Sequence, residues 1–166
     1  MSFEHQLFIP NKRAYITGAN RPKVDCILCS VCNNDPRVDN LIVWKNETVA
    51  VSVNLYPYNS GHILLFPVRH VTETTQFTDE EVMQMHKLQV HSLEILKELY
   101  NPAGFNIGYN VGYASGASIE HVHQHIVPRY NRELGFIDII SGSKIMVEDP
   151  NNTLKRLKEA FDGFRL

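Results

Sequence analysis

Short apolar segments separated by turn-forming residues run through the first half of the chain. Residues 41–44 and 48–53 flank the polar triplet Lys45-Asn46-Glu47, and residues 62–67 follow a turn-rich stretch that ends in Gly61. Short apolar runs bounded by such turns are typical of strands, and a brief polar link between two of them is typical of a hairpin. The pattern therefore predicts three consecutive strands, the first two joined as a hairpin.

A helical period follows. Thr78 and Glu81 stand three residues apart, which is the capping-box arrangement at the start of a helix, and Asn101-Pro102 can end it. Between them, apolar side chains recur at about helical spacing. These positions are Val82, Met85, Leu88, Leu93, Leu96 and Leu99. The segment is predicted to be the main helix, with His86 and His91 on its solvated polar surface.

Two more strands are predicted over residues 105–111 and 119–129, where apolar and β-branched residues recur. The loop between them, residues 112–117, contains Gly112 and Gly116, which allow a backbone to approach a ligand closely. This loop leads into the second of the two strands, which carries three histidines.

The C-terminal end of the chain carries a short amphipathic pattern. Leu154, Leu157 and Phe161 fall on one face of a helix that Asn151 or Asn152 can cap. The order of three strands, a helix, two strands and a helix predicts an α+β domain. In such a domain the sheet is antiparallel and the helices pack on one side of it.

The length of 166 residues suits one domain with its own hydrophobic core. Hydrophobic residues make up 43% of the chain and charged residues 20%, which is the composition of folded domains. We expect an N-terminal arm over residues 1–25, a core over residues 26–130, and a C-terminal extension with a helix over residues 131–166.

The charge balance argues against one class of function. The chain has 16 basic and 18 acidic residues, a formal charge of −2, so it has no global field that attracts polyanions, and we expect no stable nucleic-acid binding. No apolar run approaches the roughly 20 residues that cross a bilayer, and the polar N-terminus lacks a signal-peptide core. We therefore expect a cytoplasmic protein without a membrane partner.

Residues 121–125 read His-Val-His-Gln-His. Side chains alternate across a strand, so His121, His123 and His125 are expected on one face, about 6.6 Å apart at each step. Three buried imidazoles side by side cost desolvation and repel one another when charged, so the row favours a metal or a phosphate ligand. Either all three bind a catalytic zinc, or one neutral ring attacks phosphorus while a neighbour stabilises oxygens or protonates the leaving group.

Three cysteines, Cys26, Cys29 and Cys32, are grouped near the start of the predicted core. An odd number of closely spaced cysteines does not suit a disulfide framework, whereas Cys-x-x-Cys in a reducing compartment more often binds metal. We interpret Cys26 and Cys29 as thiolate ligands and Cys32 as a thiol outside the site. A closed tetrahedral zinc site needs two further ligands, and histidines on neighbouring strands are the best candidates.

Taken together, these motifs resemble the histidine triad (HIT) family. Residues 121–127 fit the family pattern His-φ-His-φ-His-φ-φ, where φ is apolar, except that Gln124 replaces an apolar residue. Residues 110–118 are similar to the Asn-x-Gly…Gly-x-Ser segment that precedes the triad, and Asn54 and Gly61-His62 fit as well. The similarity covers most of the chain, and the combination is much more specific than one short motif.

The resemblance implies a HIT-like antiparallel sheet of about five strands with one long helix and a short C-terminal helix. It also implies catalytic roles for particular residues. His123 is the nucleophile, and His125 contacts the phosphate or the leaving-group oxygen. Ser118 and Asn110 donate hydrogen bonds to the phosphate or the leaving group.

Further residues are implied to bind the nucleotide. Asn54 matches the position that holds the ribose hydroxyls, and His62 lines the same pocket. The backbone amides around Gly116 and Ala117 are suited to cradle anionic oxygens. Many family members have glutamine where this chain has Ala117, so the substrate contacts differ at that position.

Zinc-bearing branches of the family complete the metal site with two histidines. The matching positions here are His70 and His121, which would join Cys26 and Cys29 around one structural Zn²⁺ per chain. Four protein ligands leave no open coordination position, so such a zinc stabilises the fold and does not activate water. In this interpretation the other two triad histidines remain available for chemistry.

The implied activity is hydrolysis at the α-phosphate of dinucleoside polyphosphates or related nucleotide conjugates, through a covalent nucleotidyl-histidine. The early arm and the Cys-x-x-Cys segment look like the branch that contains diadenosine tetraphosphate hydrolases and phosphorylases. A phosphorylase that uses phosphate as acceptor, a non-catalytic nucleotide-binding protein and a three-histidine catalytic zinc centre remain alternatives. The resemblance also implies a homodimer that joins its sheets across a two-fold axis.

Overall fold

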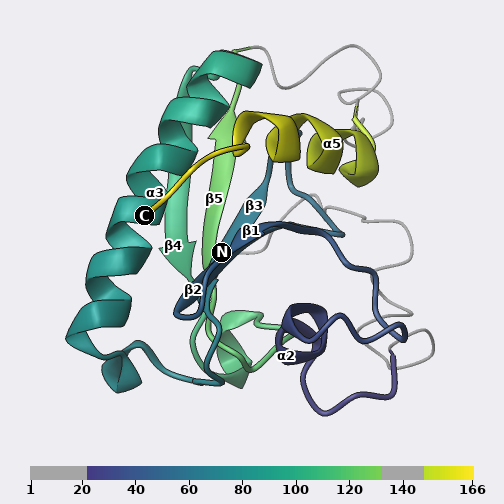
Figure 1. Cartoon of the computed structure of the whole chain (residues 1–166), viewed down its shortest axis with the longest axis vertical. Coiled ribbons are helices and arrows are strands. Elements are labelled where there is room, and N and C mark those ends of the chain that lie inside the picture. Colours follow the sequence, from purple (N-terminus) through teal and green to yellow (C-terminus); the bar gives the residue numbers. More distant parts are fainter. Residues whose placement is uncertain (1–21, 132–147) are drawn as a thin grey trace, which may run out of the picture.

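A computed structural model describes residues 22–131 and 148–166. Its five strands form one antiparallel sheet in the order β1-β2-β3-β5-β4 (Figure 1). The strands are β1 (Ile42–Lys45), β2 (Val49–Val53), β3 (Ile63–Pro67), β4 (Gly104–Tyr109) and β5 (Gln124–Arg129). The helices are α2 (Ile27–Cys32), α3 (Asp79–Tyr100) and α5 (Pro150–Ala160), with 3₁₀ turns η1 (Thr74–Gln76) and η2 (Tyr113–Ser115). The predicted α+β fold is confirmed.

The main helix α3 begins and ends where its sequence indicates. The Thr78 side chain accepts a hydrogen bond from the Glu81 N–H at 3.1 Å, and the Glu81 carboxylate accepts one from the Thr78 N–H at 2.8 Å. Asn101 ends the helix in the left-handed conformation, with φ 44°. Val82, one of the apolar positions at helical spacing, is 53% exposed because the buried face of α3 is centred on the neighbouring Glu81 and on Met85.

The C-terminal part of the chain differs from two predictions. The cap of helix α5 is Asp149, not Asn151 or Asn152, and the Asp149 carboxylate accepts a hydrogen bond from the Asn151 N–H at 2.8 Å. Pro150 therefore takes the first helical position, which proline favours because it has no N–H to leave unsatisfied. His91 is not a solvated surface residue either, since its ring stacks on Phe164 with centroids 3.8 Å apart.

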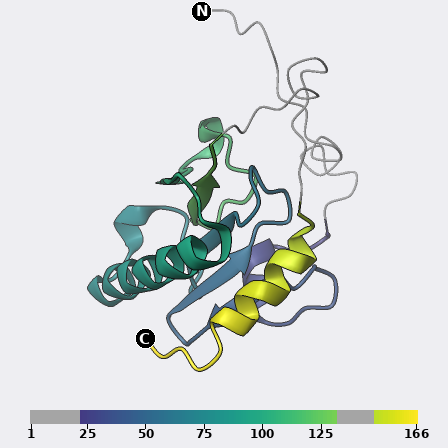
Figure 2. The same ribbon diagram turned by 90° about the horizontal axis from the view of Figure 1, so that it is seen from above.

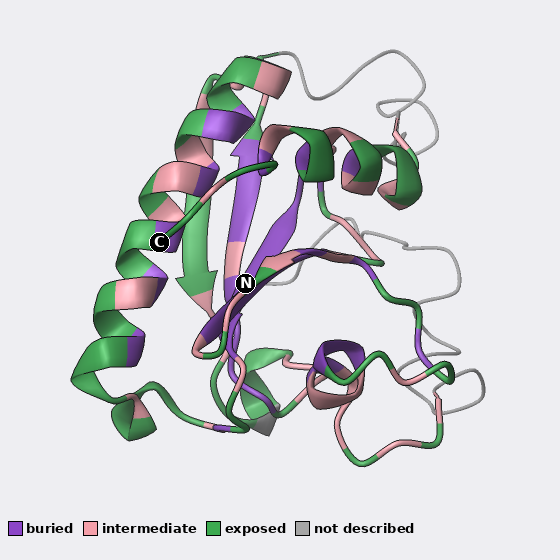
Figure 3. Ribbon diagram, viewed as in Figure 1, coloured by how far each residue is buried: buried purple, intermediate pink, exposed green. Residues whose placement is uncertain are grey.

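The two faces of the sheet bury different layers. Helices α3 and α5 lie side by side across one face (Figure 2). The larger core lies beneath them, built from β2 and β3 residues that are buried along their whole length (Figure 3). On the opposite face a smaller cluster joins α2 to the sheet. Its members are Leu28, Cys32, Ala50, Leu64 and Phe66.

The histidine strand is shorter than predicted. Strand β5 begins at Gln124, not at residue 119, and its pairing with β3 runs only from Leu65↔Gln124 to Ile63↔Ile126. The preceding backbone leaves the ladder, and the Val122 N–H donates instead to the carbonyl of Val71 at 2.8 Å. As a result, His121 and His123 lie in an irregular segment before the strand. His123 still shares a side with His125, with ring centroids 4.8 Å apart, whereas the ring of His121 turns to a different cluster.

Parts of the predicted organisation fall outside the described residues. Most of the N-terminal arm and most of the extension after residue 131 belong to residues 1–21 and 132–147. Among the helices that the structure describes, none combines the length and apolar character that a membrane span needs.

Candidate functional site

A pocket opens on the α2 side of the sheet. Its cavity volume is about 150 Å³, and it opens to solvent. Most of the residues predicted to act in catalysis or nucleotide binding line it. These are Asn54, Asn110, Gly116, Ala117, Ser118, His123 and His125. Residues as far apart in the chain as Asn54 and His125 thus line one pocket.

His123 lies in this pocket with its ring in a defined orientation. It is 4% exposed, and its Nδ1–H donates to the carbonyl of His121 at 2.8 Å. Burial lowers the pKa of His123, so the ring is neutral near pH 7. With the proton on Nδ1, the lone pair is on Nε2, which is the form of imidazole that can attack an electrophile.

His125 is held by a second hydrogen-bonded chain. The Tyr58 backbone N–H donates to Nδ1 of His62 at 3.0 Å, so a neutral His62 carries its proton on Nε2. His62 Nε2 lies 3.0 Å from Nδ1 of His125 and donates to it. His125 therefore carries its own proton on Nε2, which lies 3.4 Å from the side-chain amide of Asn110; with that amide turned, its Oδ1 accepts the proton and its Nδ2 is left to donate elsewhere. This chain prepares His125 as a hydrogen-bond donor.

His62 has a different place from the one that the resemblance implied. It is completely buried and lies behind His125, whereas the pocket wall is formed by other residues. Its ring stacks on Tyr58 with centroids 5.0 Å apart, and the amide of Asn54 lies 3.3 Å from it. The geometry thus makes His62 a residue that orients His125, not one that lines the pocket.

The loop before β5 forms the wall beside the histidines. It turns through η2 and then through Gly116, whose φ of 84° is a conformation that side-chain-bearing residues rarely adopt. The backbone of residues 116–118 follows this turn along the pocket. Peptide N–H groups presented by such turns can bind anionic oxygens.

No sequence pattern predicted the other end of the pocket. That end is apolar and combines one face of α2 with the segment before β1. Its lining residues are Ile27, Leu28, Val31, Val38 and Leu41. Apolar residues in a short helix are typical of a hydrophobic core. They line the pocket here because the fold places α2 opposite residues 116–125.

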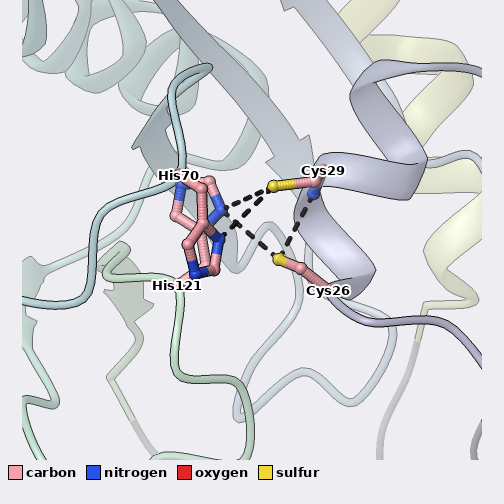
Figure 4. A group of neighbouring side chains, drawn as sticks. All are labelled: Cys26, Cys29, His70 and His121. Carbon is pink, nitrogen blue, oxygen red and sulfur yellow. Dashed lines mark hydrogen bonds between the residues drawn. The ribbon is translucent and has the colours of Figure 1, made fainter.

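A second cluster lies next to the pocket. Cys26, Cys29, His70 and His121 converge from α2, from the segment after β3 and from the segment before β5 (Figure 4). Their ligand atoms all lie within 4.8 Å of one another. The structure therefore brings together all four residues predicted to bind metal, and His121 belongs to this cluster and not to a row with the other triad histidines.

The geometry of the cluster fits a tetrahedral zinc site. Nδ1 of His121 lies 3.5 Å from Sγ of Cys26 and 3.5 Å from Sγ of Cys29, and Nδ1 of His70 lies 3.4 Å from Sγ of Cys29. Zn–S bonds of about 2.3 Å and Zn–N bonds of about 2.0–2.1 Å give sulfur-to-nitrogen edges of about 3.6 Å in a tetrahedron. The spacing is close to that of a metal-bound set.

Protonation in the cluster supports the same fit. Nε2–H of His121 donates to the carbonyl of Pro67 at 2.9 Å, which leaves Nδ1 as the lone-pair nitrogen that faces the sulfurs. Burial lowers the pKa of His121 to about 4, so it is neutral and ready to bind a cation. Burial, and then the neighbouring Cys26, raise the pKa of Cys29 to about 12. Two thiolates side by side therefore need a cation to offset their charge.

Comparison with known proteins identifies the family. A family model described as HIT domain matches residues 35–132, which is more than half of the chain. An uncharacterized HIT-like protein of Methanocaldococcus jannaschii is 30% identical over 133 residues, which cover 80% of this chain and 98% of that protein. The chain belongs to the HIT family.

Relatives with named activities are also similar. AP-4-A phosphorylase of Mycobacterium tuberculosis is 37% identical over 120 residues, 72% of this chain, and the chain spans 62% of the length of that phosphorylase. A bis(5'-nucleosyl)-tetraphosphatase (asymmetrical) of Schizosaccharomyces pombe is 26% identical over 103 residues, 62% of this chain and 57% of that protein.

Solved structures share the fold. A HIT family member from Bacillus subtilis has a TM-score of 0.61 and 28% identity, covering 66% of this chain and 76% of its own. A Zn-bound histidine triad family protein from Mycobacterium smegmatis has a TM-score of 0.67 and 24% identity, covering 83% and 94%.

Proposed function

We propose that this protein is a nucleotidyl hydrolase or transferase that cleaves dinucleoside polyphosphates, or related nucleotide conjugates, at the α-phosphate. One observation carries the proposal. The neutral ring of His123 lines the pocket with its Nδ1–H donated to the His121 carbonyl, which leaves the nucleophilic Nε2 for the substrate. The named activities of the relatives support the same class of substrate.

The chemistry has two steps. In the first, the Nε2 lone pair of His123 forms a bond to the α-phosphorus, and the bond from phosphorus to the bridging oxygen breaks. The electron pair leaves with that oxygen, to which His125 Nε2–H can donate. In the second step the oxygen of water or phosphate bonds to the same phosphorus, the N–P bond breaks, and its electron pair returns to Nε2, which restores neutral His123. When water is the acceptor, its proton passes to solvent.

The remaining pocket residues bind charge and nucleoside. No lysine or arginine lines the described part of the pocket, so the phosphate oxygens depend on neutral donors. Ser118, Asn110 and the backbone at Gly116 and Ala117 supply them. Asn54 holds the ribose, and the apolar end formed by α2 takes the nucleobase.

Water and phosphate are alternative acceptors. Water makes the protein a hydrolase, whereas inorganic phosphate makes it a phosphorylase that releases ADP from diadenosine tetraphosphate. The similarity to AP-4-A phosphorylase favours the second acceptor as a specific alternative. A protein that binds nucleotides without turning them over is the third candidate.

One structural Zn²⁺ would be held by Cys26, Cys29, His70 and His121. When bound, it supplies a cross-link among three segments of the chain, with no open coordination position for water. Because His123 lies outside this set, the arrangement argues against a catalytic zinc bound by all three triad histidines.

The partner besides the nucleotide is a second copy of the chain. Strand β4 is the edge of the sheet next to β5, and Asn106, Ile107 and Gly108 along it are exposed. An exposed edge with an apolar residue such as Ile107 suits strand pairing across a two-fold axis. The location that fits this chemistry is the cytoplasm, where nucleotides are abundant and thiols stay reduced.

Product analysis tests the activity. The protein is incubated with diadenosine tetraphosphate with and without inorganic phosphate, and the nucleotides are separated. AMP with ATP in the absence of phosphate identifies a hydrolase, whereas ADP with ATP only in the presence of phosphate identifies a phosphorylase. His123→Ala should abolish either activity. Gln124→Leu is the matched control, because Gln124 is the next residue and points to the opposite face of the sheet.

A further inference from the structure

The short helix α2 serves the metal cluster and the pocket at the same time. Cys26 is its N-cap and Cys29 lies in its first turn, while Ile27, Leu28 and Val31 form the apolar wall of the pocket. The helix has six residues, far fewer than the roughly 12–15 that an isolated helix needs to be stable in water. The position of this wall therefore depends on what holds its ends.

His121 makes a second connection between the two sites. Its ring belongs to the metal cluster, with Nδ1 3.5 Å from both sulfurs. Its backbone carbonyl accepts the hydrogen bond from Nδ1 of His123 at 2.8 Å, which sets the orientation of the nucleophilic ring. No regular ladder fixes this backbone, because β5 begins only at Gln124. The peptide unit that contains this carbonyl has two anchors, which are the Val122 N–H, donating to the carbonyl of Val71 at 2.8 Å, and the ring of His121.

We propose that metal binding and nucleotide binding in this protein are energetically coupled, with His121 as the positioning residue. A cation held by the four residues fixes the α2 wall at the nucleobase end and the His121 carbonyl at the phosphate end. The nucleotide contacts both ends, so each ligand favours the arrangement that the other needs. This inference rests on the proposed nucleotide-binding function, and it adds a dependence on the metal.

Coupling of this kind is reciprocal. If the metal raises the affinity for a nucleotide by some factor, the nucleotide raises the affinity for the metal by the same factor. Coupling between sites typically amounts to a factor of about 5–150. Because the two sites share α2 and residues 121–123, we expect at least about a fivefold effect in each direction.

Zinc release from the wild-type protein gives the direct test. The zinc-loaded protein is mixed with a chromogenic chelator in the presence and absence of saturating AMP, a nucleotide that cannot be cleaved at a phosphoanhydride. We expect AMP to raise the apparent zinc affinity, measured from the zinc released to the chelator at equilibrium, at least about fivefold. AMP should lose this effect in Asn54→Ala, in which binding of the ribose is weakened. AMP that binds the loaded protein but leaves zinc release unchanged would overturn the inference and leave the proposed function intact.

A matched pair of variants tests the reverse direction. His70 belongs to the metal cluster but lies outside the pocket lining, so His70→Ala removes one ligand and His70→Cys replaces it. We expect AMP affinity by calorimetry to fall at least about fivefold in His70→Ala and to recover in His70→Cys. Equal AMP affinity in the two variants would contradict the coupling.

Hydrogen exchange on the wild-type protein distinguishes local coupling from general stabilisation. Because it needs no variant, it also applies if His70→Ala does not fold. In the zinc-loaded wild type, AMP should protect α2 and residues 119–123 more than the amides of α3. Uniform protection would contradict the proposed route. Loaded protein that does not bind AMP at all would overturn the proposed function, and the coupling with it.

Discussion

The hydrogen-bonded chain behind His125 leads to a specific prediction for His62. Replacing His62 by phenylalanine preserves an aromatic ring against Tyr58 but removes the donor that lies 3.0 Å from Nδ1 of His125. His125 then loses the contact that keeps its proton on Nε2. The ring can adopt the other tautomer or another rotation, so fewer molecules present a donor to the leaving group.

The size of the effect follows from this one contact. A hydrogen bond whose loss leaves a polar group unsatisfied is worth about 1–3 kcal/mol. If His125 contributes its hydrogen bond mainly in the transition state, that energy corresponds to a decrease of about 5- to 150-fold in kcat. Since His62 does not line the pocket, KM should change much less.

Steady-state kinetics on diadenosine tetraphosphate measures the split between kcat and KM for His62→Phe. His62→Gln retains an amide donor and should recover part of kcat. Thermal unfolding of both variants shows whether they fold, because the Tyr58 N–H also loses its partner in His62→Phe. A folded His62→Phe protein with wild-type kcat, or one with only a raised KM, would refute the role assigned to His62.

Three further substitutions test the packing. Gln124→Leu removes a buried Oε1 without a hydrogen-bond partner among the described residues, so we expect about 1–2 kcal/mol of added stability in urea unfolding. Gly61→Ala should cost about 1–3 kcal/mol, because Gly61 has φ 77° and an added Cβ would lie 3.2 Å from the Tyr100 ring; an unchanged urea midpoint would contradict this. Burial lowers the pKa of His91, opposed by Glu94, so the unfolded chain takes up protons near pH 6.5 that the folded chain resists. Stability should therefore fall as the pH drops below about 6.5, and His91→Phe should flatten this dependence in thermal melts; identical pH profiles would contradict the assignment.

The parts of the fold that were predictable carry local signals. The capping box of Thr78 and Glu81 marks the start of α3, and the hairpin around Asn46 marks β1 and β2. The metal cluster was also predictable as a set, although only through the family resemblance. Cys-x-x-Cys indicates two ligands, and no local pattern connects it to His70 or His121.

The errors have a common physical cause, which is tertiary contact. The segment before β5 matches the strand pattern, but the His121 ring and the Val122 N–H bind partners outside the sheet, so the strand begins later. His91 is polar and lies on a helix, yet Phe161 and Phe164 from the far end of the chain cover it. Neither contact can be inferred from neighbouring residues.

The apolar end of the pocket is the clearest case of a pocket wall without a sequence signal. Ile27, Leu28 and Val31 occupy positions that any small core would fill. They line the pocket because α2 lies opposite the histidines. That position depends in turn on a sheet in which β3 lies between β2 and β5.

The central claim is that Nε2 of His123 attacks the α-phosphorus. Rapid quenching of a single turnover on diadenosine tetraphosphate, followed by peptide mass spectrometry, measures this directly. We expect an acid-labile adenylyl group on His123 in the wild type and none in His123→Ala. An adenylyl group on another residue, or turnover that persists in folded His123→Ala protein, would contradict it.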